Sequence, residues 1–372
     1  LSFSSFSFSG ERKTDWLWRS REIPVRNPNQ TNGRFVNRPY DRRRVPETEK
    51  EKRVGFGAVV KSPSHPRQQT IKHNYLPERI TTTMKVTKAV IPAAGLGTRM
   101  LPIARSVPKE ALPIVDRPAI SYLVEEAAKS GITDILIITG RNKGMIEDYF
   151  DYSPEYEDKL RAGGKEKQIG ELRKIAEIAN ITFLRQHEAK GLGHAIYRAR
   201  SFTGDEPFAV LYGDDIIFSE TPVCAQLISA YEKYGLPAAG IKEVAPELVC
   251  RYCTMGMDRL DGNMYHIFDM IEKPKPEQIM TNYSILGRVL LTPEIYDILE
   301  VTPPGAGGEL QLTDAMKVIC HRSGMTGVDF EGKRYDMGSK LGFMTANVEQ
   351  AVKHPEIGAE FTAYLKEFVK TL

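Results

Sequence analysis

The chain has 372 residues, of which 41% are hydrophobic, enough apolar side chains for one large buried core or two modest ones. No stretch approaches the roughly 18 apolar residues of a membrane-spanning helix, so we expect no membrane partner. The formal charge of +3 hides an asymmetry, because residues 1–83 carry 17 Lys and Arg against 8 Asp and Glu and the remainder is mildly acidic.

Residues 1–83 have the composition of a disordered segment. Alternating Ser and Phe give way to Arg42-Arg43-Arg44 and scattered Pro and Asn, without an amphipathic period. The aromatic interleaving of a nucleic-acid-binding arm is missing, and the acidic residues disfavour a cleaved targeting peptide. We therefore expect a disordered basic N-terminal extension, interpreted as translated upstream sequence or a retained leader, a folded domain over 84–372, and no nucleic-acid partner.

The first predicted element is a buried strand at residues 86–91, a short apolar run. Residues 93–97 (Ala-Ala-Gly-Leu-Gly) follow it, and their small side chains let backbone N–H groups approach an anion. Arg99 and Lys109 add two cations within reach of this loop. The pattern predicts a loop that holds a triphosphate and neutralises the charge that develops when the triphosphate is cleaved.

Strands and helices then alternate along the chain. Apolar residues at 120, 123, 124, 127 and 128 have helical spacing between Pro118 and Gly131. Further strands are expected at 132–138, 181–184 and 208–212, and a helix at 171–179. This alternation predicts a parallel sheet covered by helices on both faces.

Ligands of such sheets bind beyond the carboxyl ends of the strands. The glycine loop follows the first predicted strand, Gln186 the third and Asp214 the fourth. A glutamine amide can both donate and accept, which suits the edge of a base, and a carboxylate can hold magnesium against phosphate oxygens. On the residues alone, the alternative for Gln186 is an exposed polar residue that binds no ligand. The alternative for Asp214 is an aspartate that only caps a turn.

Beyond residue 241 the pattern is mixed. Strand-like pieces at 265–271 and 284–291 precede the loop 303–308, and we expect this half to bind the second substrate. Near the end of the chain, Phe361, Tyr364, Leu365, Phe368, Val369 and Leu372 keep helical spacing. We expect this helix to pack on its own domain, with a contact in a homo-oligomer as the alternative.

Seven ordered motifs between residue 84 and about residue 370 resemble those of the sugar-nucleotide pyrophosphorylases, and among these the bacterial-type UTP–glucose-1-phosphate uridylyltransferases. They are the loop region 95–118, Arg185-Gln186, Lys190-Gly-Leu-Gly-His-Ala195, Gly213-Asp-Asp215, Ile271-Glu-Lys-Pro274, Gly308-Glu-Leu-Gln-Leu-Thr-Asp314 and Tyr335-Asp-Met-Gly-Ser-Lys-Leu-Gly342. The resemblance implies an α/β, Rossmann-like fold with a mixed, mostly parallel central sheet flanked by helices. It implies that UTP and glucose 1-phosphate react by direct in-line attack to give UDP-glucose and pyrophosphate.

The resemblance also implies roles for individual residues. Arg99 and Lys109 are expected to be catalytic, and Glu272 and Lys273 to bind the sugar phosphate. The residues expected to bind the nucleotide are Ala94, Gly95, Gly97, Thr98, Glu110, Gln186 and Gly191.

Asp214 and Asp336 are expected to be ligands of Mg2+. For Asp336 this expectation rests on the resemblance alone, and the role of Asp215 stays open. The segment containing Glu309 and Gln311 resembles one beside the sugar pocket, without an assigned role.

Two departures from the family pattern are Ala104-Arg105 in place of Thr-Lys and Tyr252-Cys253 in place of the common Tyr-Gly. Cys250 and Cys253 match C-x-x-C, but a second pair at zinc-site spacing is missing, and the four cysteines fit a reducing cytoplasm better than a disulfide framework. A nicotinamide-dependent dehydrogenase is disfavoured, because Met100 stands where its fingerprint needs a small residue. The remaining alternatives are a thymidylyl- or adenylyltransferase acting on glucose 1-phosphate and an inactive nucleotide-binding regulator.

Overall fold

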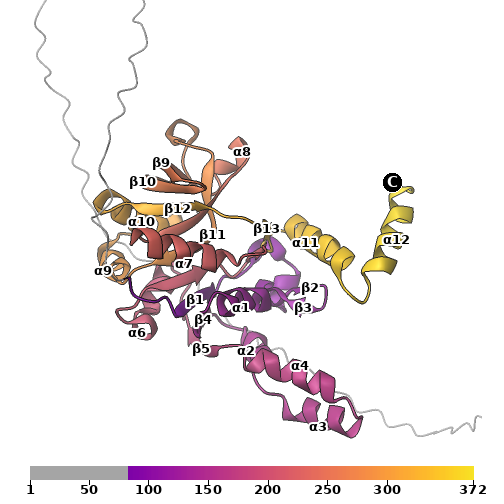
Figure 1. The fold of residues 1–372 in the computed structure, drawn as a ribbon. Coiled ribbons are helices and arrows are strands. Elements are labelled where there is room, and N and C mark those ends of the chain that lie inside the picture. Colours follow the sequence, from indigo (N-terminus) through magenta and orange to yellow (C-terminus); the bar gives the residue numbers. More distant parts are fainter. Residues whose placement is uncertain (1–82) are drawn as a thin grey trace, which may run out of the picture. The chain divides into compact units, whose positions relative to one another are not determined.

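The computed structural model describes residues 83–372, which all belong to one compact unit. The expected disordered extension lies outside the described residues apart from Thr83, so it stays a prediction. A nine-stranded sheet runs through the described part (Figure 1). Its strands are β1 (Lys88–Ala93), β4 (Asp134–Thr139), β5 (Asn180–Arg185), β6 (Phe208–Leu211), β8 (Ala238–Glu243), β9 (Cys253–Asp261), β10 (Met264–Glu272), β11 (Tyr283–Leu291) and β12 (Met325–Asp329).

The strand order is β5-β4-β1-β6-β11-β8-β12-β10-β9. Strands β5, β4, β1 and β6 pair in parallel, and β12 is parallel to β8. Strand β11 is antiparallel to β6 and β8, and β10 is antiparallel to β12 and β9. Within this sheet β10 and β11 therefore run against the other strands, and the expected mixed, mostly parallel sheet is confirmed.

Helices cover both faces of the sheet (Figure 1). They are α1 (Ala119–Lys129), α2 (Gly144–Phe150), α3 (Pro154–Ala162), α4 (Glu166–Ala176), α5 (Leu192–Arg198), α6 (Arg200–Thr203), α7 (Val223–Tyr234), α8 (Pro246–Val249), α9 (Glu294–Val301), α10 (Leu312–Arg322), α11 (Lys340–Lys353) and α12 (Gly358–Val369). Alternate residues of β1 point to opposite faces. Val90 belongs to the core that contains Ile196 of α5 and Ile295 of α9, whereas Ile91 packs in the core that contains Leu123 of α1.

The region between β4 and β5 differs from the expectation. The helix expected at 171–179 begins and ends earlier, at Glu166 and Ala176, and helices α2 and α3 precede it unpredicted. The buried residue of α3 is Glu157, whose carboxylate accepts hydrogen bonds from Arg173 of α4 at 2.7 and 3.1 Å. Because an ion pair rather than an apolar face joins α3 to α4, hydrophobic periodicity gave no signal there.

Two short strand pairings and five 3-10 helices complete the described part of the fold. Strands β7 (Asp215–Phe218) and β13 (Lys333–Asp336) form a separate antiparallel sheet in which Asp215 is opposite Asp336. Strands β2 (Pro113–Ile114) and β3 (Arg117–Pro118) form a hairpin. The short 3-10 helices are η1 (Thr98–Met100), η2 (Ile103–Arg105), η3 (Lys109–Ala111), η4 (Pro276–Gln278) and η5 (Ala306–Gly308).

The C-terminal helices leave much apolar surface uncovered. Helix α12 contacts α11, and of its residues Gly358 is buried. Tyr364 is 60% exposed and Phe368 44%, and their rings stack on each other along the helix. The expected packing of this apolar face on its own domain is therefore wrong, because α11 covers little of it. A homo-oligomer contact stays a prediction. Among the helices of residues 83–372, each is too short or too polar to cross a bilayer.

Candidate active site

A cavity of about 410 Å³ lies beyond the carboxyl ends of β1, β5 and β6. As the sequence predicts, the loop after β1 and the residues that follow β5 and β6 meet there. The cavity brings together the following candidate residues: Ala94, Gly95, Gly97, Thr98, Lys109, Glu110, Gln186, Gly191 and Asp214.

Glycines allow the backbone to close around this cavity. The chain turns after β1 through Gly97, whose φ of 67° lies in the left-handed region that favours glycine. At the end of β6, a Cβ on Gly213 would lie 2.6 Å from the carbonyl oxygen of Pro92. A larger residue would push the ends of β1 and β6 apart, so this close approach fixes where the next residue, Asp214, enters the cavity.

Two cations and two carboxylates meet around Asp214, which lines the cavity together with Lys109, whereas Arg99 and Asp336 are not among its lining residues. The Lys109 ammonium donates a hydrogen bond to Oδ2 of Asp214. Arg99 Nη1 lies 3.2 Å from Oδ2 of Asp336, and Nη2 lies 3.8 Å from Oδ2 of Asp214. The backbone N–H of Met337 donates to the Asp214 carbonyl at 2.8 Å. The pairing of β7 with β13 therefore places Asp336 beside Asp214, although the two are far apart in sequence.

The charges of this cluster stabilise one another. Burial disfavours the charged form of Asp214, but the attraction of Lys109 and Arg99 for the carboxylate outweighs burial, so the pKa of Asp214 is lowered. Burial likewise opposes the Lys109 ammonium, but Asp214 and Glu110 raise its pKa. Lys109 is therefore a fixed cation at neutral pH.

Behind this cluster lies a buried ion pair that the sequence did not reveal. The Lys143 ammonium lies 2.7 Å from Oε2 of Glu110, with the two side chains 7% and 1% exposed. Burial disfavours both charges, so it raises the pKa of Glu110 and lowers that of Lys143. The Glu110 carboxylate thus contacts Lys143, which follows β4 as the other site residues follow their strands. Its position after a strand is the sequence signal by which Lys143 could have been identified.

Gln186 is oriented by a histidine. Its Nε2 lies 2.7 Å from Nδ1 of His194 on α5, and because an amide nitrogen donates, Nδ1 accepts. Burial lowers the pKa of His194, which favours the neutral imidazole that this hydrogen bond requires. The carbonyl oxygen of the amide is therefore left to accept a hydrogen bond at the cavity.

A second, smaller cavity of about 110 Å³ adjoins the first and shares Leu192 and Tyr212 with it. Glu272 lines it, and its Oε2 accepts a hydrogen bond of 2.9 Å from the hydroxyl of Thr313. Burial raises the pKa of Glu272. Lys273 follows with φ 45°, a left-handed backbone that is uncommon for lysine, and its side chain is exposed.

The segment 309–313 closes both cavities. Glu309 lines the larger one, whereas Gln311 and Thr313 line the smaller one. The backbone of Leu310 holds the segment in place, because its N–H donates to the Lys190 carbonyl and its carbonyl accepts from Gly193, each at 2.8 Å. The sequence resemblance placed this segment beside the sugar pocket but gave it no role.

The departure at Cys253 changes the wall of the smaller cavity. Its Sγ accepts a hydrogen bond of 3.3 Å from the N–H of Ile285, and burial raises the pKa of the thiol to about 12. The thiol is therefore protonated and unreactive at neutral pH. All four cysteines lie in the described part of the chain and form no disulfide.

Asp215, whose role the sequence left open, is held by two arginines. Its carboxylate pairs with Arg334, with Oδ1 at 2.7 Å from Nε and 2.5 Å from Nη2. Its backbone carbonyl accepts from Arg288 Nη1 at 2.8 Å. Arg288 is fully buried and pairs with both carboxylate oxygens of Glu126, at 3.0 and 2.7 Å. Asp215 thus anchors the turn that carries Asp214.

Replacing Glu126 by Gln should lower the free energy of unfolding by about 3–5 kcal/mol, because breaking a buried ion pair leaves an uncompensated charge on Arg288. Denaturant unfolding measures the change. The matched control is Glu125→Gln, which breaks partly exposed contacts to Arg117 and Lys129 and should cost about 1 kcal/mol or less. Equal losses in the two variants would contradict the expectation.

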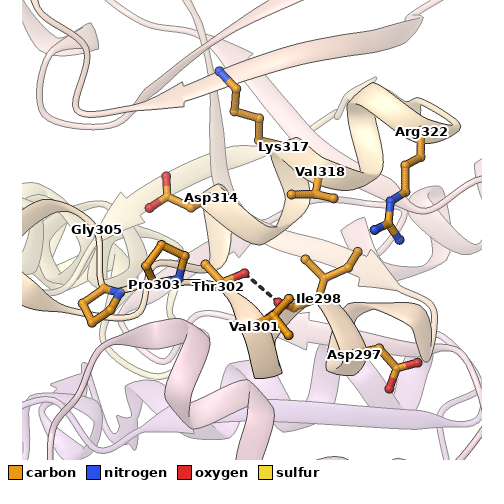
Figure 2. A pocket seen from close by; sticks show the side chains of 11 residues that line it. Asp297, Ile298, Val301, Thr302, Pro303, Gly305, Asp314, Lys317, Val318 and Arg322 are labelled. Atoms are coloured by element: carbon orange, nitrogen blue, oxygen red, sulfur yellow. Dashed lines mark hydrogen bonds between the residues drawn. The ribbon is translucent and has the colours of Figure 1, made fainter.

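A third cavity, of about 480 Å³, lies between α9 and α10, and its lining residues differ from those of the two cavities above (Figure 2). Ile298, Val301 and Val318 give it apolar walls, and the hydroxyl of Thr302 donates to the Ile298 carbonyl at 2.7 Å. Lys317 at its edge pairs with Asp269 at 3.0 Å. Its charges are thus dispersed, in contrast to the cluster around Asp214.

Within residues 83–372, His, Cys, Asp and Glu side chains nowhere gather in threes that could hold a metal. Asp214 nevertheless lines the cavity beyond β1, β5 and β6, and Arg99 contacts the carboxylates of both Asp214 and Asp336, so that these two carboxylates lie close together. Magnesium is usually bound by one or two protein carboxylates, with substrate phosphates and water as the other ligands. The donor set fits that mode of binding.

Comparison with known proteins identifies the family of the chain. The Nucleotidyl transferase family model matches residues 88–352. A UTP–glucose-1-phosphate uridylyltransferase of Bacillus subtilis (strain 168) is 49% identical over 77% of this chain and 96% of its own length. A protein of the same name from Staphylococcus epidermidis is 47% identical, over 76% and 98%.

Solved structures give the same result. A UTP-bound UGPase from Acinetobacter baumannii is 34% identical with a TM-score of 0.71, covering 76% of this chain and 99% of that one. A UDP-glucose pyrophosphorylase complexed with UDP-glucose is 42% identical with a TM-score of 0.66, covering 73% and 100%. The resemblance predicted from the sequence is confirmed, and the chain belongs to the nucleotidyl transferase family.

Proposed function

We propose that this chain is a UTP–glucose-1-phosphate uridylyltransferase. A phosphate oxygen of glucose 1-phosphate attacks the α-phosphorus of UTP, the bond from that phosphorus to the bridging oxygen breaks, and pyrophosphate leaves. The meeting of Arg99 and Lys109 with Asp214 and Asp336 beyond the strand ends carries the proposal. Relatives that bear this activity as their name support it.

The chemistry needs no protein nucleophile, because the sugar phosphate is already an anion. The protein has to position the two substrates and neutralise charge. Lys109 is 15% exposed and fixed by Asp214, whereas Arg99 is 63% exposed and free to change partner. We assign Lys109 to the charge that grows on the departing pyrophosphate and Arg99 to the triphosphate as it binds.

Mg2+ is the cofactor of this proposal, with Asp214 and Asp336 as its protein ligands. When bound, the ion neutralises phosphate oxygens. Lys109 pairs with Asp214 and Arg99 with both carboxylates, which holds the Asp336 side chain beside Asp214. The reaction is assigned to the cytoplasm, which fits the reduced cysteines.

The two cavities are assigned to the two substrates in this proposal. The larger one holds the nucleotide in the proposal, with Ala94, Gly95, Gly97 and Thr98 along the phosphates and sugar. The smaller one holds glucose 1-phosphate, with the Glu272 carboxylate accepting sugar hydroxyls and Lys273 meeting the sugar phosphate. Leu192 and Tyr212 belong to both linings, so the two substrates would lie in contact there.

Gln186 is proposed to read the base. Its carbonyl oxygen, left free by the bond to His194, suits the N3–H donor of uracil, whereas cytosine has an acceptor there. Gln186→Ala should raise the KM for UTP roughly threefold to tenfold, the worth of one hydrogen bond, and narrow the preference for UTP. Exposed Gln168 on α4 provides the control, Gln168→Ala, which should change neither quantity.

Pyrophosphate release from UTP, dTTP, ATP, CTP and GTP with glucose 1-phosphate tests the whole assignment. Wild-type protein should prefer UTP. A preference for ATP or dTTP under matched conditions would transfer the assignment to the adenylyl or thymidylyl alternative. Inactivity with all five would favour the nucleotide-binding regulator.

A further inference from the structure

One side chain lies between the two proposed halves of the site. Arg334 is in β13, two residues before Asp336, and its side chain is 17% exposed. It shares one edge of its guanidinium with Asp215, the neighbour of Asp214. Both carboxylates proposed to bind metal are therefore within two residues of this ion pair.

The other side of the same guanidinium contacts Tyr252, a residue that lines the smaller cavity. Arg334 Nη1 donates to the hydroxyl of Tyr252 at 3.3 Å, and its Cζ lies 5.3 Å from the centre of the Tyr252 ring. Tyr252 lines that cavity together with Glu272. A hydrogen bond and a cation–π contact thus fix the tyrosine from one direction.

The backbone of Tyr252 continues this connection. Its carbonyl accepts a hydrogen bond of 2.7 Å from the N–H of Lys273, the residue held in a left-handed conformation. Such strain persists where the surrounding structure holds it, and it is common at functional sites. An unbroken series of contacts therefore runs from Asp215 through Arg334 and Tyr252 to Lys273.

We propose that Arg334 is a positioning residue that links the Asp214–Asp336 carboxylate pair to the Glu272–Lys273 pair, and so aligns the sugar phosphate with the α-phosphate of the nucleotide. This inference rests on the proposed function. The bond from Arg334 to Asp215 fixes it on the nucleotide side, and its contacts with Tyr252 fix the wall of the sugar side.

Arginine suits this role for a geometric reason. Its planar guanidinium donates through Nε and Nη2 to one partner while Nη1 donates to another and the plane faces a ring. A lysine in the same place keeps the charge near Asp215 but has a single ammonium, so it loses the fork that reaches Tyr252. Arg334→Lys therefore keeps the positive charge beside Asp215 while it removes the contact that positions Tyr252.

The experiment compares Arg334→Lys with wild type in initial-rate assays with UTP and glucose 1-phosphate. We expect the KM for glucose 1-phosphate to rise and kcat to fall, jointly by about 10²-fold in kcat/KM, the cost of a small misplacement of reactants. The KM for UTP should stay unchanged. The control is Arg259→Lys, an exposed arginine of β9 that donates to the Gly262 carbonyl, which should leave all three constants unchanged.

Two further measurements keep the inference testable without turnover. Binding of UDP-glucose in the absence of magnesium, measured by calorimetry, should weaken in Arg334→Lys, while binding of UMP should not. Tyr252→Phe removes the hydroxyl contact and keeps the ring, so it should shift the KM for glucose 1-phosphate in the same direction by less. Because the two residues act together, their effects should combine less than multiplicatively.

The outcomes separate this inference from the proposed function. If Arg334→Lys lowers thermal stability but leaves the KM for glucose 1-phosphate unchanged, Arg334 is merely structural and the inference is wrong. An equal rise in the KM for UTP also overturns it. Should Arg334→Lys not fold, the KM values of Tyr252→Phe for glucose 1-phosphate and for UTP decide instead. Wild-type protein that fails to form UDP-glucose would instead overturn the proposed function.

Discussion

Replacing Lys109 by Ala should lower kcat by about 10²–10³, the cost of about 2.7–4 kcal/mol that follows the loss of one donor to developing charge. The ammonium is largely buried, hydrogen-bonded to Asp214 and held protonated by its neighbours. It therefore needs no rearrangement to receive the charge of departing pyrophosphate. Single-turnover kinetics at saturating UTP measure the chemical step.

The control for this variant is Lys129→Ala, since Lys129 is 64% exposed and pairs with Glu125 on the surface of α1. It should react at the wild-type rate. A Lys109→Ala protein with normal kcat and only weaker UTP binding would show that the lysine serves ground-state binding. The Lys109 contact would then belong to capture of the triphosphate, as we propose for Arg99.

Asp214→Asn and Asp336→Asn should each raise the magnesium concentration needed for half-maximal rate and reduce kcat severely. Each change keeps the shape of the side chain and removes one charge from the pair around Arg99. Because both carboxylates are proposed to serve one ion, the double variant should be little worse than the more damaged single one. Rates measured across a magnesium titration test both statements.

Asp148→Asn, at an exposed position of α2, is the matched control and should behave as wild type. Normal turnover of Asp336→Asn at limiting magnesium would remove Asp336 from the ligand set. Asp215 would then be a poor replacement, because its buried carboxylate is occupied by Arg334.

Local sequence was enough to predict the parallel half of the sheet. Strands such as β4 are nearly continuous apolar runs, and helix α1 has marked ends at Pro118 and Gly131, so each could be placed within a few residues. Parallel strands end at one edge of the sheet, and ligands bind beyond their carboxyl ends. This rule correctly predicted that Gln186 and Asp214 line the same cavity.

Contacts that depend on distant pairing could not be predicted in this way. The pairing of β7 with β13 joins Asp215 to Asp336, and neither segment carries a periodic signal in four residues. Arg334 reaches the site through this pairing and was missed. Lys143 was missed as well, although it follows β4 as the predicted site residues follow their strands. Asp336 was found through resemblance alone, and its role as a ligand stays a prediction.

The wall shared by the two cavities constrains how specificity can diverge. Tyr212 and Leu192 face both cavities, and the chain from Glu309 to Thr313 closes both. A substitution at Tyr212 that enlarges one cavity therefore also reshapes the other. With the two cavities holding the nucleotide and the sugar phosphate as proposed, base choice and sugar choice are not independent, and an engineer who seeks a new nucleotide sugar has to vary both cavities in one library.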